Sequence, residues 1–184
     1  MKSALALAAA LLFAPAVLSS QALGLLSQMG IAVILCLSFW LLMGQGGMVS
    51  FGHALYSGLG AFVAIYALRA VEAGAVWPVA LVPLLAALAV AALAWPLGWL
   101  ATRHDSAMVF AMITLGLGEL GWAIAQMLPG LFGGEAGIAA DRTAGSAHAG
   151  MSLGPAWQVY LLVLAYAAAT FALVRGFTRT ALGR

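Results

Sequence analysis

Charged residues are scarce in this chain. Lys, Arg, Asp and Glu make up 7% of its 184 residues, whereas soluble domains carry about 25%. Hydrophobic residues reach 65%, so a soluble domain of this composition could not cover its surface with polar groups. The composition excludes a disordered chain, a coiled coil and a secreted disulfide scaffold. It indicates an integral membrane protein that lies in the lipid bilayer.

Cysteine and lysine are also nearly absent. A single cysteine, Cys36, excludes an intrachain disulfide and a CxxC metal site. The single lysine, Lys2, precedes every glycine-rich segment, so no phosphate-binding P-loop can form and the chain cannot hydrolyse ATP by that route. The few basic residues form no patch with interleaved aromatics, which argues against nucleic-acid binding. We expect no metal, no cofactor and no catalytic residue.

Long apolar runs fill most of the chain. A transmembrane helix needs about 20 predominantly apolar residues. Five apolar segments are predicted to span the membrane, and a sixth, at the N-terminus, is short and contains Pro15. The segments are 4–18, 25–43, 54–68, 76–101, 107–128 and 156–174. The sequence therefore predicts an all-α, polytopic transmembrane helix bundle that forms a single domain over 1–184.

Residues 1–22 have two interpretations. Met1 and Lys2 followed by an apolar stretch and small residues are typical of a cleaved secretory signal peptide. A retained first transmembrane helix fits the same residues. Both interpretations give every later span the same orientation.

The distribution of Lys and Arg predicts the orientation of the spans. With the N-terminus in the cytoplasm, Arg69 and Arg142 lie outside, and five basic residues lie inside. These five are Lys2, Arg103, Arg175, Arg179 and Arg184. Segment 130–155 is then a periplasmic loop, long enough to have its own structure, and the tail at 175–184 is cytoplasmic.

Segment 44–62 is rich in glycine for a membrane protein. Six glycines lie between positions 44 and 60, and they would weaken a lipid-facing helix, because backbone groups in hydrocarbon need internal partners. The pattern predicts a broken or re-entrant helix that lines a cavity or packs on neighbouring helices. A tight turn followed by a well-packed helix, without substrate contact, fits it equally. The candidate pathway or packing residues are Gly46, Gly47, Ser50, His53 and Gly58.

Three of these residues have more specific expected roles. Gly58 and Ala54, spaced i,i+4, form a small-residue face for close helix approach. His53, at the expected helix start, contacts substrate or simply bonds to nearby backbone. Ser50 and His53 would be the nucleophile and base of an intramembrane hydrolase, but no carboxylate is near them in the sequence.

Glu119 lies near the middle of 107–128. An acidic side chain at a helix centre costs about 3 kcal/mol to insert. We therefore expect Glu119 to face the bundle interior, to have a polar partner, and to tolerate glutamine better than leucine. The letters at 116–121 match GxGxxG, but a dinucleotide site needs a preceding strand, so we expect these glycines to allow helix contact.

Three segments match known patterns in a fixed order. Residues 37–62 contain G-x-x-G-x-x-S-x-G-H-A, residues 108–126 contain T-L-G-x-G-E, and residues 133–138 fit G-G-x-x-G-[IL]. The matched positions are Gly44, Gly47, Ser50, Gly52, His53 and Ala54, then Thr114, Leu115, Gly116, Gly118 and Glu119, then Gly133, Gly134, Gly137 and Ile138. Together they resemble permease subunits of bacterial ABC importers for branched-chain amino acids, and the LivM-type more than the LivH-type.

The resemblance implies a multi-pass subunit of the bacterial inner membrane that forms half of a translocation pathway with a second, LivH-type permease. Separate cytoplasmic ATP-binding subunits would hydrolyse ATP, and a periplasmic substrate-binding protein would deliver the amino acid. Family members continue past Arg184 into a coupling segment and further spans, so we expect the permease domain to be incomplete at its C-terminus. The alternatives are a membrane-embedded enzyme and a non-functional truncated permease.

Overall fold

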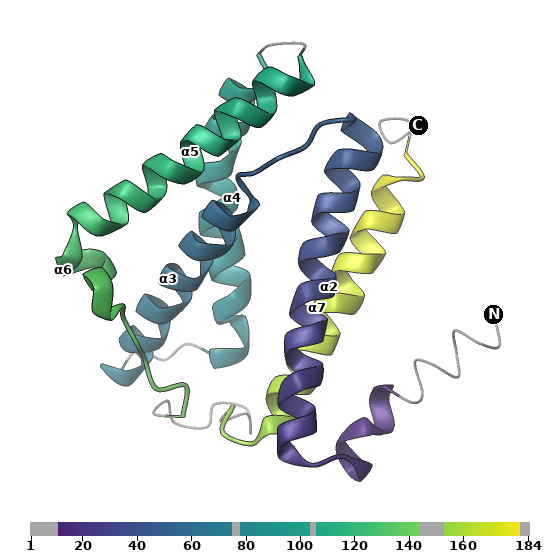
Figure 1. Cartoon of the computed structure of the whole chain (residues 1–184). Helices are drawn as coiled ribbons and strands as arrows, with labels where there is room; N and C mark the ends of the chain where they lie inside the picture. The colour runs from purple at the N-terminus through teal and green to yellow at the C-terminus, as the bar shows by residue number, and fades with distance from the viewer. Residues whose placement is uncertain (1–10, 75–77, 104–105, 144–152, 181–184) are drawn as a thin grey trace. The chain divides into compact units, whose positions relative to one another are not determined.

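The computed structural model describes residues 11–74, 78–103, 106–143 and 153–180. All regular structure in these residues is helical, which confirms the predicted all-α fold (Figure 1). The elements are α2 (Ser20–Gly46), α3 (His53–Glu72), η1 (Val79–Leu81), α4 (Val82–Ala101), α5 (Ala107–Met127), α6 (Pro129–Phe132), η2 (Gly134–Ala136) and α7 (Ala156–Phe177).

Five helical segments are long and apolar enough to cross a membrane: α2, α3, η1 with α4, α5 and α7. They coincide with the five later segments predicted from the sequence, and α2, α3 and α7 extend beyond the predicted ends. Residues 11–17 are also helical, whereas residues 1–10 of the predicted first segment lie outside the described residues.

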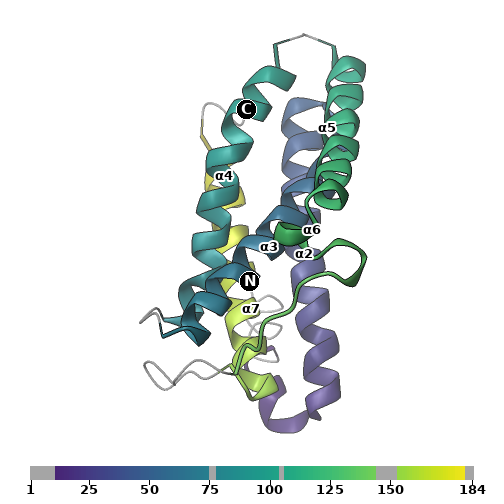
Figure 2. The ribbon, with the colours of Figure 1, turned by 90° about the vertical axis from the view of Figure 1, so that its left-hand side faces the viewer.

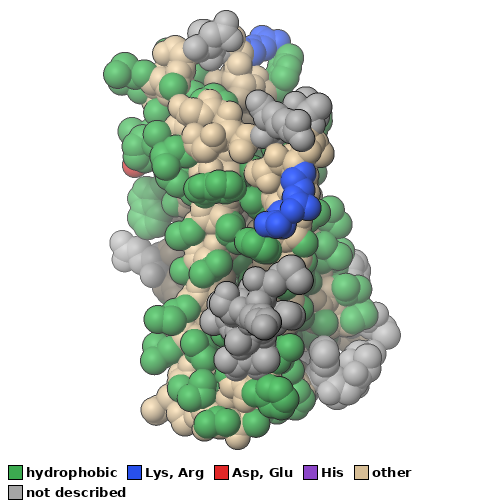
Figure 3. All heavy atoms as spheres, turned by 90° about the vertical axis from the view of Figure 1, so that its right-hand side faces the viewer, with side chains coloured by type: hydrophobic (Ala, Val, Ile, Leu, Met, Phe, Trp, Pro, Cys, Tyr) green, Lys and Arg blue, Asp and Glu red, His purple; other side chains and the backbone are tan. Residues whose placement is uncertain are grey.

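Large apolar side chains remain exposed along these helices. Trp95 is 82% exposed and Leu173 is 74% exposed, and hydrophobic side chains occur along the helices in the face seen in Figure 3. Such surface would be unfavourable in water but is the natural surface of a helix in lipid. The exposed faces therefore agree with membrane-spanning helices.

The chain divides into two compact units. Unit 1 comprises residues 1–38 and 153–184, and unit 2 comprises residues 39–152. In unit 1, Gly30 of α2 faces Val163 of α7, where a Cβ would collide with the valine side chain. The Tyr160 hydroxyl, on α7, donates to the Leu11 carbonyl at 2.9 Å. A missing side chain on α2 thus allows a close approach to α7.

Unit 2 holds α3, α4 and α5, which run beside one another (Figures 1 and 2). α3 packs more extensively on α4 than on α5. At the end of α4, the Arg103 guanidinium lies 3.8 Å from the centroid of the Trp99 ring. A cation over an aromatic ring at a helix end is typical of a membrane–water interface. α5 begins where Ser106 Oγ accepts a hydrogen bond from Val109 N at 3.5 Å.

Candidate functional site

The predicted helix break is present between α2 and α3. α2 ends at Gly46, residues 47–52 are not helical, and α3 begins at His53. Gly47 has a φ of 61°, a left-handed conformation that glycine adopts without the steric penalty of a side chain. Gly47 therefore ends α2 through its backbone conformation.

The break lies beside the interior of α5, a candidate membrane span, and not beside its end. Phe51 N donates to Thr114 Oγ1 at 3.2 Å, and Thr114 lies seven residues after the start of α5. At 1.5 Å per residue this position is roughly 10 Å along a helix of about 31 Å. Irregular backbone at this depth needs partners inside the protein, and a buried threonine hydroxyl supplies one.

Ser50 stabilises the same break. Its side chain is 6% exposed, and its Oγ accepts a hydrogen bond from Gly52 N at 3.2 Å. Thr114, on the facing helix, is 3% exposed. Two buried hydroxyls thus bond to the two backbone N–H groups that immediately precede α3.

His53 lies at the first position of α3, as predicted. Its Nδ1 is buried without a hydrogen-bond partner, and its ring packs edge-on against Phe39 with centroids 5.4 Å apart. No hydrogen bond joins Nδ1 to Ser50 Oγ, so the structure does not pair these two atoms as a base and a nucleophile.

Two glycines differ from their expected packing roles. Within the described residues, no atom lies within 4 Å of a Cβ built on Gly47 or Gly58. No close helix approach therefore occurs at Gly58 among the described residues of this chain, and its packing role stays a prediction. The reason is that α3 packs mainly on α4, where Gly60 faces Val90, and Gly58 lies on the face toward α5. Gly46 packs locally, with the end of the Met48 side chain 3.0 Å from a built Cβ.

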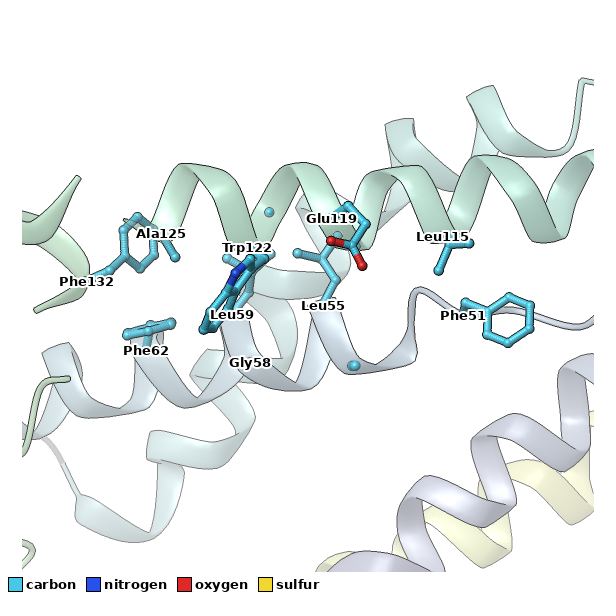
Figure 4. A pocket seen from close by; sticks show the side chains of 13 residues that line it. Phe51, Leu55, Gly58, Leu59, Phe62, Leu115, Glu119, Trp122, Ala125 and Phe132 are labelled. Carbon is cyan, nitrogen blue, oxygen red and sulfur yellow. The ribbon is translucent and has the colours of Figure 1, made fainter. Parts of the chain in front are cut away.

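A cavity of about 290 Å³ lies between α3 and α5. Figure 4 shows side chains from both helices directed into it, with Phe132 at one end and Phe51 at the other. Its lining, as far as the described residues form it, is apolar except for Glu119 and the indole N–H of Trp122. The lining residues are Phe51, Ala54, Leu55, Gly58, Leu59, Phe62, Leu115, Gly118, Glu119, Gly121, Trp122, Ala125 and Phe132.

Glu119 extends from α5 toward the first turns of α3 (Figure 4). It lies twelve residues after the start of α5, roughly 18 Å along the helix, so its predicted position near the middle of the span is confirmed. Its side chain is exposed in this chain alone. Among the described residues we find no hydrogen bond or ion pair to its carboxylate, so its expected polar partner stays a prediction.

Gly121 allows contact between α3 and α5. A Cβ at this position would overlap Leu55 of α3. The expectation that glycines in 116–121 serve helix contact is thus confirmed for Gly121, whereas no atom of the described residues packs within 4 Å of a Cβ at Gly116.

The chain after α5 forms an irregular segment over residues 129–143, which we call the strap. It comprises α6, η2 and the residues up to Thr143, and it includes residues 130–143 of the predicted 130–155 loop. Its glycines at 133, 134 and 137 have φ values of 77°, 57° and 67°. Phe132 packs edge-on against Phe62 of α3 with centroids 4.8 Å apart. The strap therefore covers one end of the cavity.

Three side chains of α3 hold the strap. The Tyr66 hydroxyl donates to the Leu131 carbonyl, and Arg69 Nε donates to the Ala139 carbonyl at 3.1 Å. Glu72 Oε1 accepts a hydrogen bond from Asp141 N at 2.6 Å. Sequence reasoning missed this role, although the spacing of three polar residues at i, i+3 and i+6 on one face of an apolar helix was a usable signal.

Asp141 closes the strap locally. Its carboxylate accepts hydrogen bonds from Thr143 Oγ1 at 2.7 Å and from Thr143 N at 2.8 Å. These bonds, from the side chain first and then the backbone, lower the pKa of Asp141, and the charge of Arg142 adds to the effect.

Comparison with known proteins identifies the family. Residues 21–184 match the family described as "Branched-chain amino acid transport system / permease component". The chain therefore belongs to this permease family: it is a multi-pass transport component of the plasma membrane, and not an enzyme. Permeases of this family work within ABC transporter complexes. No curated protein and no solved structure matches the chain.

Proposed function

We propose that this chain is a LivM-type subunit that forms one half of the pathway of an ABC importer for branched-chain or related amino acids. The helix break between α2 and α3 carries the proposal. Non-helical backbone at membrane depth is tolerated where protein encloses it or where it lines a cavity. Many transporter binding sites lie at such discontinuous helices near the bilayer midplane. Here the cavity begins at the break, at Phe51.

The candidate residues act in this pathway without a chemical step. Gly47 and Ser50 shape the break, His53 begins the helix beside it, and Gly58 and Glu119 line the cavity. Gly46 ends α2. Because the chain has no P-loop, the energy for transport comes from separate ATP-binding subunits. A second, LivH-type permease completes the pathway, and a periplasmic substrate-binding protein delivers the amino acid.

Residues 1–184 form one transmembrane permease domain in this proposal, with 130–155 in the periplasm. The five-to-two distribution of basic residues supports this orientation. The hydrogen bonds from α3 to the strap add support, because they bring Arg69 and the strap to the same end of unit 2, as alternating spans require.

Transport is tested by uptake of radiolabelled leucine, isoleucine and valine. The host lacks its own branched-chain permeases, and the chain is produced together with a second permease, ATP-binding subunits and a binding protein. We expect uptake that requires this chain and ATP. If the complex assembles but carries none of the three amino acids, the proposal is wrong.

Orientation is tested by cysteine labelling at two exposed positions, Ala139→Cys and Thr180→Cys, each on a Cys36→Ser background. A membrane-impermeant maleimide should label position 139 from the periplasm and position 180 only after the membrane is opened. Ala144, in the same loop, lies outside the described residues. Labelling of position 139 only from the cytoplasmic side would contradict the proposed topology.

A further inference from the structure

The cavity between α3 and α5 is built by missing side chains. Within the described residues, no atom lies within 4 Å of a Cβ at Gly58, and the nearest atom to a Cβ at Gly118 is the Phe51 carbonyl oxygen at 4.0 Å. Ala54, Gly121 and Ala125 are further small residues of the lining. The volume of about 290 Å³ lies at the lower end of the range for small-molecule pockets, about 300–1,000 Å³. The space therefore suits a small ligand such as a single amino acid.

The walls of the cavity are apolar on both helices. Leu55, Leu59 and Phe62 line it from α3, and Leu115 and Trp122 line it from α5. Burial of an aliphatic group between such walls is favourable by the same free energy as burial in a protein core, about 0.8 kcal/mol per CH₂. They offer nothing to a strongly hydrated substrate.

Among the described residues of this lining, Glu119 is the one ionisable side chain. A carboxylate near the centre of a spanning helix is costly unless it has a partner or is protonated, and we find no partner for it among the described residues. A ligand that carries an ammonium group would supply one. The bond between an ammonium and a carboxylate is charge-assisted, and it is among the strongest in proteins.

The first turn of α3 lies across the cavity from Glu119 (Figure 4). This turn has no side-chain cap, and Ala54 and Leu55 of the same turn line the cavity. The N-terminal end of a helix carries partial positive charge and unpaired backbone N–H groups. It complements the carboxylate of a zwitterion whose ammonium group is at Glu119.

We infer that this cavity is a binding site for an aliphatic α-amino acid, with the Glu119 carboxylate holding the ammonium group and the apolar walls holding the side chain. The inference rests on the proposed transport function and adds a location and a recognition residue to it. It also refines the expected behaviour of Glu119→Gln. Glutamine keeps the shape and the hydrogen-bonding capacity of the residue, so the complex should assemble, but glutamine lacks the charge that binds an ammonium group.

The test measures protection of a cysteine in the cavity. Ala125→Cys on a Cys36→Ser background is placed in the assembled complex in membranes without the binding protein, and its labelling rate by a small maleimide is followed. Three ligands are added separately: leucine, 3-methylbutylamine, which lacks the carboxylate, and 4-methylpentanoate, which lacks the ammonium group. Ala123→Cys, on the same helix but outside the cavity lining, is the control position.

Leucine and the amine should slow labelling at position 125, while the acid should need at least tenfold higher concentration. In Glu119→Gln, the concentration of leucine that gives half protection should rise about tenfold or more, because a hydrogen bond to a charged group contributes at least that factor. Glu72→Gln, outside the cavity and still able to accept the Asp141 N–H, should leave protection unchanged.

Three results would overturn the inference. The first is equal protection by the amine and the acid. The second is unchanged protection in Glu119→Gln. The third is a loss of complex yield in Glu119→Gln, which would assign the carboxylate to a cation of the second permease. An absence of protection with normal leucine uptake would reject this site but leave the transport function intact, whereas an absence of uptake by the assembled wild-type complex would reject the function itself.

Discussion

The helix break at 47–52 and the strap at 129–143 both bond irregular backbone to side chains, but they use different kinds of side chain. Both are irregular segments at the ends of spanning helices, so both have backbone groups that no helix satisfies. At the break, the short hydroxyls of Ser50 and Thr114 bond to the backbone, and both are nearly buried. At the strap, the long side chains of Tyr66, Arg69 and Glu72 do so, in exposed positions.

The difference follows from the environment. At membrane depth no water can replace a lost partner, so each backbone group needs a fixed and enclosed bond. In an exposed segment water competes with every bond, and each contributes only about 0.5–1.5 kcal/mol. We therefore expect the loss of a bonding side chain to lower stability more at the break than in the strap. In the strap, we expect backbone conformation to contribute more to stability than these side-chain bonds.

The largest expected effect is that of Gly133→Ala in the strap. Gly133 has a φ of 77°, and a Cβ there would overlap the carbonyl of Gly137. The left-handed conformation alone costs about 1–2 kcal/mol for an L-residue, and the overlap is with backbone, which cannot move away easily. The strap should detach, which is measured as faster labelling of Ala139→Cys. Gly130→Ala is the control, because no described residue packs within 4 Å of a Cβ at that position, and equal rates in the two variants would contradict the prediction.

Thr114→Val should have the next largest effect. Valine keeps the shape but removes the hydroxyl that accepts from Phe51 N. An unsatisfied buried N–H costs about 1–3 kcal/mol, so the thermal midpoint in detergent should fall. Thr114→Ser keeps the hydroxyl, so its thermal midpoint should fall less. A thermal midpoint for Thr114→Val at or above that of Thr114→Ser would show that this bond does not stabilise the break.

Gly47→Ala and Gly58→Ala should shift stability in opposite directions. Alanine at position 47 must adopt a φ near 61° and should lower the free energy of unfolding by about 1–2 kcal/mol. Alanine at position 58 enters open space within α3 and should raise it by up to about 1 kcal/mol through helix propensity. The two unfolding curves in the same detergent test this contrast, and destabilisation of similar size at both positions would refute it.

The smallest expected effect is the pH dependence of the strap. The Thr143 bonds lower the pKa of Asp141 in the folded state, so its contribution is fully present above the ordinary aspartate pKa. It is lost as the pH falls through the lowered value. Hydrogen exchange of the Thr143 amide, corrected for its intrinsic pH dependence, should show constant protection at neutral pH and a loss in acid. In Asp141→Asn this acid-dependent step should disappear.

Much of the fold could be predicted because hydrophobicity is a local signal. Twenty apolar residues determine a spanning helix wherever they occur, and the five later spans agree with the observed helices. The break could be predicted for a similar reason, since glycines such as Gly47 cannot support a lipid-facing helix. The predicted helix ends were less accurate. α2 runs from Ser20 to Gly46 and not only over 25–43, because the polar and glycine residues at its ends remain compatible with helical backbone.

The sequence by itself thus determined that this is a membrane permease, where its spans lie, and that a helix breaks near Gly47. Tertiary structure decided which residues meet: Thr114 with Phe51 N, Glu72 with Asp141 N, and Glu119 with the cavity beside Gly58. The physical reason is that insertion into lipid depends on the composition of each segment alone. A hydrogen bond or a cavity between helices depends on the rotation and register of two helices, which their packing fixes.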